Sequence, residues 1–387
     1  MGDQPDARRN TLPTVSGAAA RVEVVQTALA SCHLETLGDT LPESLKPEAT
    51  AQNTGRKRPN LRLGLYFTPV RNGMDYLAKA VDDLTECTPP SARSLKYAVL
   101  HLQAATEVLL KARLVGEHWS LVYDDPRVAS LKEFQKGNFK SCGIEATMDR
   151  LTEIAAVNIA PADRVAINNL ASDRNALTHY GHTADAFLIE ARTARVLSFL
   201  ITFIENQLRP MLEAKFQEAF RNASEESFRV TPANVYKVLE SPEVAHAQRE
   251  TNEVINTMGD LRLKLGRVEK LVDSRMKEIS GELAPWKHCT VLCPHCLQWA
   301  LVVNSDGSFN PIKCHFCLTV YNNVELAAID YAMHVVGEEN GTVVECSKCQ
   351  CETVVIGANI ANDKDSDIAV CFNCADIYTH SHPSSAE

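Results

Sequence analysis

The sequence predicts a mainly α protein, in which a helical bundle and a long connecting helix precede two small β-type units that each contain four paired cysteines. Apolar residues recur three or four positions apart from about residue 70 to residue 223, which is typical of amphipathic helices. A second run with this spacing covers residues 231–279. Ten of the thirteen cysteines lie between Cys289 and Cys374, where short β-type runs replace the helical pattern.

These changes of pattern divide the chain into five predicted segments. Residues 1–60, rich in Ala, Thr, Pro and charge, form a partly ordered N-terminal arm. Residues 61–225 form the helical bundle, and residues 226–284 form a helical connector. Residues 285–335 and residues 336–387 form the two cysteine-bearing units.

The composition limits the class of protein. With 387 residues, 45% of them hydrophobic and 23% charged, the chain resembles an ordinary soluble protein with two or three domains. Its formal net charge of −10 argues against a protein that coats nucleic acid non-specifically. The amino terminus lacks the pattern of a signal peptide, and no apolar run approaches the ~20 residues needed to cross a bilayer. We therefore expect a cytoplasmic protein that does not contact membranes.

The first two predicted helices are separated by a proline pair. The helix over 71–88 carries Met74, Leu77, Val81 and Leu84 on one face and stops at Pro89. Ser91 is a good N-cap for the second helix, which extends to about residue 119. Its predicted core face is formed by Leu95, Val99, Leu102, Leu109 and Leu110.

Three further helices complete the predicted bundle of about five. Two cover residues 143–157 and residues 161–180. The third opens at residues 183–185, carries inward apolar residues up to Leu208, and should kink or break at Pro210.

The connector contains one apolar stripe. It consists of Ile255, Met258, Leu261, Leu265, Val268, Val272 and Ile279. This spacing fits a short coiled coil with another chain, and equally a helix packed on its own bundle. After Pro285 the pattern changes to β-type runs such as 299–303 and 342–344.

The paired cysteines indicate two metal sites. The pairs are Cys293/Cys296, Cys314/Cys317, Cys346/Cys349 and Cys371/Cys374. The gaps between successive pairs suit two zinc ribbons, each with four thiolates around one structural Zn, so that we expect two Zn per chain. A disulfide framework is the alternative, but it suits secreted proteins better. The spare candidates, one of which could replace a named ligand, are Cys289, Cys351, His295 and His315.

Both predicted sites are closed, because protein groups fill all four positions and leave none for a catalytic water. Residues 285–387 contain four Lys, no Arg and twelve Asp or Glu, a formal net charge of −8. Such a surface repels phosphate. We therefore expect the ribbons to contact a protein partner or trigger, or to serve only as a folding device.

Arg174, Asn175 and His179 form the most informative motif, close to the end of a predicted helix. A permanent cation and a side chain that exchanges protons near neutral pH can together cleave a phosphodiester without a catalytic metal. Arg174 falls in line with Leu170 and Leu177, where the pattern asks for an apolar residue. The alternative interpretation is a buried Arg174 paired with an acid such as Glu107. Arg174 and His179 lie about 140° apart around the axis at 3.6 residues per turn.

Stretches 94–102, 105–114 and 117–121 resemble the second helix of the HEPN superfamily. Arg174-Asn175 followed by His179-Tyr180-Gly181 resembles the Arg, four to six residues, His motif of that superfamily. The resemblance covers roughly residues 65–222. It implies an antiparallel helical bundle that dimerises as a homodimer or higher oligomer and brings two Arg/His sets into one cleft. Many such domains are metal-independent endoribonucleases in toxin–antitoxin, abortive-infection and other antiviral systems.

The resemblance implies catalytic roles for three residues acting on an RNA substrate. His179 would act as general base or acid for attack of the ribose 2′-OH, Arg174 would stabilise phosphoryl charge, and Asn175 would orient the phosphate or His179. Glu107, Lys111 and Tyr180 are supporting candidates: Glu107 to hold Arg174 and Lys111 to touch RNA. Gly181 stands where some HEPN toxins carry a modified Tyr, so we expect no modifying partner. The alternative function is a non-catalytic HEPN and zinc-ribbon scaffold that recruits partner proteins in a defence or toxin–antitoxin complex.

Overall fold

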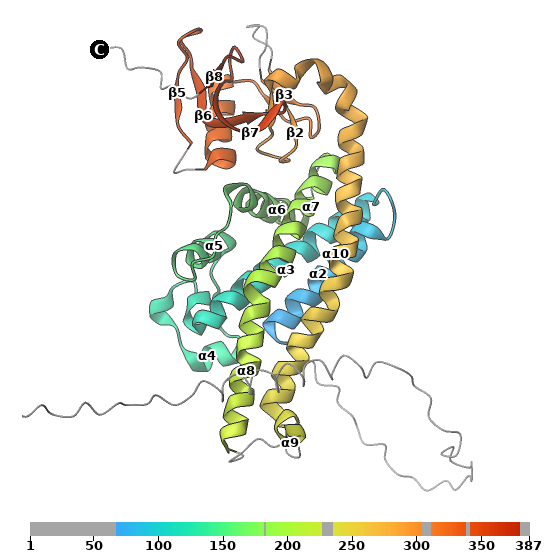
Figure 1. Cartoon of the computed structure of the whole chain (residues 1–387), viewed down its shortest axis with the longest axis vertical. Coiled ribbons are helices and arrows are strands. Elements are labelled where there is room, and N and C mark those ends of the chain that lie inside the picture. Colours follow the sequence, from blue (N-terminus) through green and yellow to red (C-terminus); the bar gives the residue numbers. More distant parts are fainter. Residues whose placement is uncertain (1–66, 182, 227–234, 304–310, 338–340, 380–387) are drawn as a thin grey trace, which may run out of the picture. The chain divides into compact units, whose positions relative to one another are not determined.

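A computed structural model describes residues 67–181, 183–226, 235–303, 311–337 and 341–379. Every described residue belongs to one compact unit, which spans Leu65–Glu387. The expected N-terminal arm therefore lies outside the described residues. The described part is mainly helical, as predicted, and ends in strands that form one antiparallel sheet where two separate ribbons were expected (Figure 1). None of its helices has the length and apolar character that a membrane span needs.

Two long helices, α2 (Pro69–Thr85) and α3 (Ala92–Glu117), begin the bundle. Ser91 is the N-cap of α3, as predicted, and its hydroxyl accepts a hydrogen bond from the backbone N–H of Ser94. The two helices approach closely at Gly73, where an added Cβ would lie 2.5 Å from the Cγ of the fully buried Leu109. Gly73 is therefore required by packing at a point where the backbone conformation is ordinary.

Short elements connect α3 to the next long helices. They are η3 (Trp119–Val122), η4 (Pro126–Val128), α4 (Leu131–Lys136) and α5 (Ile144–Glu153). The predicted helices over 161–180 and from residue 183 are α6 (Pro161–His179) and α7 (Ala186–Phe203). Asp185 caps α7 by accepting hydrogen bonds from the backbone N–H groups of Phe187 and Leu188.

The expected disruption at Pro210 takes the form of a π-helical turn, and the helix does not end there. The turn η5 (Ile204–Leu208) joins α7 directly to α8 (Arg209–Glu226). The backbone N–H of Arg209 bonds to the carbonyl of Ile204, five residues earlier. This wider turn explains how the chain tolerates a proline, which lacks an N–H and would otherwise clash with the carbonyl four residues before it.

The connector is α9 (Val235–Leu239) followed by the long helix α10 (Pro242–Leu283). Figure 1 shows α10 running beside α7 and α2 toward the strand region. Its stripe is buried against the chain's own bundle, through Met258, Leu261, Leu265, Val268 and Val272. Packing on the bundle therefore accounts for the stripe, and the coiled-coil alternative is not needed to explain it.

All the described strands belong to one antiparallel sheet. The strands are β1 (Thr290–Leu292), β2 (Trp299–Val302), β3 (Ile312–Cys314), β4 (Val320–Tyr321), β5 (Val343–Glu345), β6 (Glu352–Ile360), β7 (Asp363–Cys371) and β8 (Ile377–Thr379). Their order is β4-β3-β2-β1-β6-β7-β8, with β5 also paired to β6. Pairing of Val291 with Ile360 joins the two cysteine-bearing segments in one sheet. Three other elements, η6 (Ala284–Cys289), α11 (Val324–Tyr331) and η7 (Ala332–Val336), flank these strands in the chain.

We expect Gly73→Ala to destabilise the bundle by about 1–3 kcal/mol, because Leu109 is enclosed and cannot move away from the new methyl group. Gly259→Ala on α10 is the matched control, since its Cβ would meet open space and Ala favours helix by roughly 1 kcal/mol. Urea unfolding of both variants measures the difference. A Gly73→Ala protein as stable as Gly259→Ala would contradict this account of the α2–α3 contact.

Candidate functional site

The three residues of the Arg/His motif lie on the last two turns of α6. The helix ends at His179, Tyr180 is its C-cap, and Gly181 has the left-handed φ of +82° that a C′ glycine often adopts. The predicted helix end is therefore confirmed. Arg174, Asn175 and His179 are all exposed.

The prediction that Arg174 interrupts the apolar stripe of α6 is wrong by one residue. The buried residues of this helix are Ala166, Ile167, Leu170 and Asp173, and Arg174 faces solvent. A step of three from Leu170 reaches the core at Asp173, so the helix turns the next residue outward. The buried charge is the carboxylate of Asp173, which accepts two hydrogen bonds from Nη1 of Arg192 on α7, at 2.9 and 2.8 Å.

The structure brings some of the motif residues together. Nη1 of Arg174 donates to the side-chain oxygen of Asn175 at 2.9 Å. The rings of His179 and Tyr180 lie 6.2 Å apart, and Tyr180 is 93% exposed. Within the described residues, no hydrogen bond links His179 to Arg174. One protomer therefore presents an oriented guanidinium and a separate imidazole on one helix end.

The supporting candidates on α3 form a group of their own. Nζ of Lys111 lies 2.5 Å from a carboxylate oxygen of Glu107 and donates to the hydroxyl of Ser141 at 2.9 Å. The expected contact of Glu107 with Arg174 is not formed among the described residues. Glu107 thus neutralises Lys111, its neighbour one turn along the same helix.

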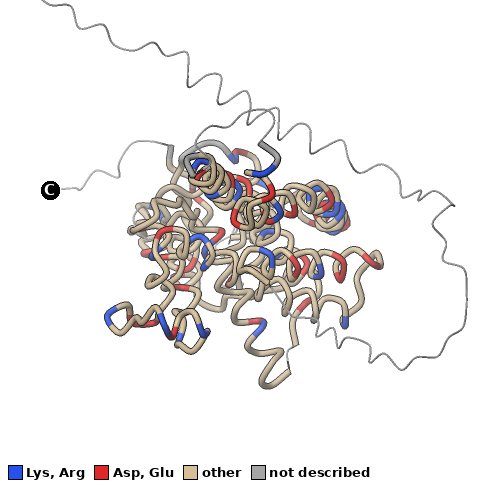
Figure 2. The backbone as a smooth tube through the Cα atoms, turned by 90° about the horizontal axis from the view of Figure 1, so that it is seen from below, with Lys and Arg blue, Asp and Glu red and all other residues tan. Residues whose placement is uncertain are grey.

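The charges of the described residues do not gather into a broad basic region in the view of Figure 2. Basic and acidic residues are interspersed along the helices in the view of Figure 2. A cavity of about 330 Å³ is lined by residues including Asp163, Arg195, Phe199 and Asn206. It lies at the amino-terminal end of α6, since Asp163 belongs to the first turn, and His179 is at the other end.

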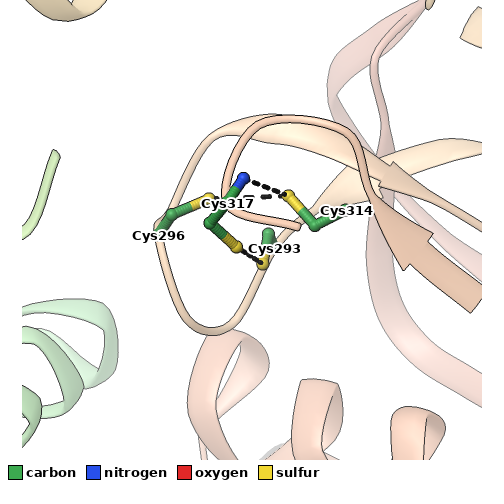
Figure 3. A group of neighbouring side chains, drawn as sticks. All are labelled: Cys293, Cys296, Cys314 and Cys317. Atoms are coloured by element: carbon green, nitrogen blue, oxygen red, sulfur yellow. Dashed lines mark hydrogen bonds between the residues drawn. The ribbon is translucent and has the colours of Figure 1, made fainter. Parts of the chain in front are cut away.

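The eight predicted cysteine ligands form two compact groups. Cys293, Cys296, Cys314 and Cys317 are all buried, and their side chains converge in Figure 3. The second group is Cys346, Cys349, Cys371 and Cys374. The closest sulfur–sulfur distances are 3.6–3.7 Å in both groups. A tetrahedron with metal–sulfur bonds of about 2.3 Å has edges of ~3.8 Å, so both groups suit a structural metal ion.

Each cysteine pair forms the same loop. The residue after the second cysteine has a left-handed φ of 55–60° in all four loops, at Leu297, Leu318, Gln350 and Ala375. Its backbone N–H donates to the carbonyl of the first cysteine at 2.8–3.0 Å. A non-glycine residue rarely adopts this φ. The repetition indicates that the loop geometry is imposed by the need to point both sulfurs at one centre.

The spare candidates lie outside the two groups. Sγ of Cys289 donates to the carbonyl of Trp286, and Sγ of Cys351 accepts a hydrogen bond from the Asn373 amide. The His315 ring lies 3.6 Å from a carboxylate oxygen of Glu282. The eight cysteines named from the spacing are therefore the ones that cluster.

Burial raises the pKa of the Cys293 and Cys296 thiols, whereas hydrogen bonding with Cys293 and its neighbours lowers the pKa of Cys317. Thiols with raised pKa values stay protonated until a metal displaces their protons. Metal binding at this group is therefore linked to proton release.

Two polar clusters were not predicted from the sequence. Arg192 lies four residues from both Leu188 and Val196, so a cation in an apolar helical stripe was the available signal. The other cluster centres on Asp330, which lies 3.6 Å from Nε2 of His295 and 3.2 Å from Nε2 of His334 and accepts a hydrogen bond from Tyr321. Burial and this carboxylate raise the pKa of Tyr321 well above its usual value.

Comparisons with known proteins leave the chain without an assigned family. No protein-family model matches it, and no significant similarity to a curated protein or to a solved structure was found.

We expect about two metal ions per chain in the purified protein, one for each four-cysteine group. Cys293→Ser should remove one ion, because a hydroxyl replaces a thiolate ligand. Cys351→Ser is the matched control and should keep both, since this cysteine lies outside the groups. Elemental analysis by mass spectrometry counts and identifies the metal. Loss of an ion from Cys351→Ser, or two ions retained by Cys293→Ser, would contradict the assignment.

Proposed function

We propose that the chain is a metal-independent endoribonuclease of the HEPN toxin or antiviral-effector type. The observation that carries the proposal is the exposure of Arg174, Asn175 and His179 together on the last two turns of α6, with Arg174 oriented by Asn175. A solvent-facing guanidinium and imidazole can together cleave a phosphodiester without a catalytic metal.

The proposed reaction is attack of a ribose 2′-OH on the adjacent phosphorus. His179 removes the proton from the 2′-OH, and the imidazolium formed in this way protonates the departing 5′ oxygen. Arg174 donates hydrogen bonds to the phosphoryl oxygens as their negative charge grows. Asn175 fixes the guanidinium through its side-chain oxygen. The products are a 2′,3′-cyclic phosphate and a free 5′-OH.

A homodimer supplies the complete site in this proposal. Within one helix, Arg174 and His179 lie about 140° apart around the axis, and no hydrogen bond joins them among the described residues. A second α6 end, related by a two-fold axis, places the imidazole of one protomer near the guanidinium of the other. Their exposure leaves both side chains accessible for such an arrangement.

The four-cysteine groups bind structural zinc in this proposal and do not take part in the chemistry. Zinc fits because all the clustered donors are thiolates in a tetrahedral spacing. The net charge of −8 over residues 285–387 opposes contact with RNA phosphates. RNA is therefore held at the helical end, and the sheet is left to support the site or to contact a protein partner or trigger.

A second candidate function is a non-catalytic scaffold. It is favoured by three exposed apolar side chains that follow one another at steps of three and four along α11 and η7. They are Leu326, Ile329 and Met333, at 60%, 44% and 43% exposure. Such a stripe suits a protein contact. The cleavage assay below distinguishes the two functions.

We expect the purified dimer to cleave tRNA or single-stranded RNA in EDTA and to leave 2′,3′-cyclic phosphate ends. His179→Ala should lower the rate by on the order of 10²–10⁴, and Arg174→Ala by about 10²–10³. Arg127→Ala is the matched control, because Arg127 is exposed in η4 and pairs with Asp125, the N-cap of that short helix, outside α6. Metal content is measured after the EDTA step, so that loss of structural metal is not mistaken for loss of catalysis.

Expression of the wild type and the variants in growing cells extends the assay to an enzyme that needs a cellular trigger. Growth arrest by the wild type that disappears in His179→Ala, but not in Arg127→Ala, supports the nuclease. The nuclease proposal is contradicted, and the scaffold favoured, if the dimeric wild type and both site variants leave RNA equally intact and all strains grow equally.

A further inference from the structure

A continuous set of contacts runs from the first four-cysteine group to the end of α6. His295 lies inside the loop between Cys293 and Cys296, and its backbone carbonyl accepts a hydrogen bond from Nε of Arg192 at 3.2 Å. The same guanidinium donates through Nη1 to both carboxylate oxygens of Asp173. Arg192 therefore connects a metal-ligating loop to the residue immediately before Arg174.

The connection is buried. Arg192 is 8% exposed and Asp173 is 4% exposed. An ion pair removed from water holds its geometry closely, because a charge left without its partner there is very costly. The contact with His295 uses a backbone carbonyl, so its position follows the path of the cysteine loop and not a flexible side chain.

The second loop of this group also reaches α7. Phe316, between Cys314 and Cys317, packs against Phe187 with ring centroids 5.7 Å apart. The guanidinium of Arg275 lies over the Phe187 ring at 4.3 Å and pairs with Glu190, which is 1% exposed. Both loops of the first group thus rest on the helix that carries Arg192.

The second group has no comparable connection. Among the described residues, no hydrogen bond joins the loops of Cys346/Cys349 or Cys371/Cys374 to α6 or α7. Cys346 and Cys371 belong to a small hydrophobic cluster separate from the main core. Loss of metal from the first group therefore tests the connection to α6, and loss of metal from the second group is the control within the same chain.

We propose that Arg192 is a positioning residue through which metal binding at Cys293, Cys296, Cys314 and Cys317 fixes the end of α6. With the four sulfurs held by metal, the loop presents the His295 carbonyl to Arg192, and Arg192 holds Asp173. With the metal lost, the loop no longer fixes that carbonyl, and the last turns of α6 become mobile. The consequence for RNA cleavage rests on the proposed function, whereas the coupling itself does not.

Hydrogen exchange of the full chain, read by mass spectrometry over residues 173–181, tests the coupling directly. Cys293→Ser, shown to have lost one metal ion, and Arg192→Met should each raise exchange there by on the order of tenfold or more. Cys293→Ser frees the loop whose carbonyl positions Arg192, and Arg192→Met removes the ion pair with Asp173. Cys346→Ser, also lacking one ion, should leave this segment as in the wild type. Arg192→Lys should be intermediate, because one ammonium can pair with Asp173 but cannot reproduce both guanidinium contacts.

Peptides covering residues 254–268 of α10 report general destabilisation in the same samples. The proposal is overturned if residues 173–181 exchange hydrogen as slowly in Cys293→Ser and Arg192→Met as in the wild type. It is also overturned if, in both variants, exchange rises as much in the α10 peptides as in residues 173–181. RNA cleavage is scored separately on the same proteins. Wild-type cleavage by Arg192→Met despite faster exchange would overturn its positioning role. An increase in exchange with no cleavage by any protein would leave the coupling standing and reject only the nuclease.

Discussion

The buried pair of Arg192 and Asp173 is the interaction on which the arrangement of the candidate site depends. Both side chains are almost completely removed from water, so separating them costs about 3–5 kcal/mol in a typical protein. This cost fixes the rotation of α6 about its own axis. Once Asp173 faces the core, the next residue, Arg174, must face solvent, and the helix end at His179 follows from the same rotation.

Much of the fold follows from local sequence rules that this chain obeys closely. The sequence correctly places the N-cap Ser91, the C′ glycine Gly181 and the two four-cysteine groups. Helix caps and cysteine pairs are recognisable because they depend on only a few neighbouring residues. The rotation of α6 about its axis was predicted wrongly, because the buried residue is Asp173 and not Arg174. Periodicity assigns apolar residues to the core, and nothing local shows that Arg192, nineteen positions away, makes an aspartate the buried residue.

Features that depend on distant parts of the chain were not predicted, for the same reason. Pairing of Val291 with Ile360 unites two segments that the cysteine spacing treats as separate units, and strand pairing at that distance leaves no mark in either segment alone. The π-turn before Pro210 is a similar case, since a proline predicts a disturbance of the helix but not its form. The four-cysteine groups, in contrast, are specified by residue type and spacing together, which is why the cysteines that cluster were identified correctly.

In the proposed dimer, Arg174 of one protomer and His179 of the other act on the same phosphate. Mixing inactive Arg174→Ala and His179→Ala proteins under conditions that exchange protomers tests it most directly. A shared site predicts recovery of cleavage to about a quarter of the wild-type rate, because half of the dimers are mixed and each has one complete site. A mixture as inactive as either variant alone, beside an active wild type treated identically, would contradict the shared site.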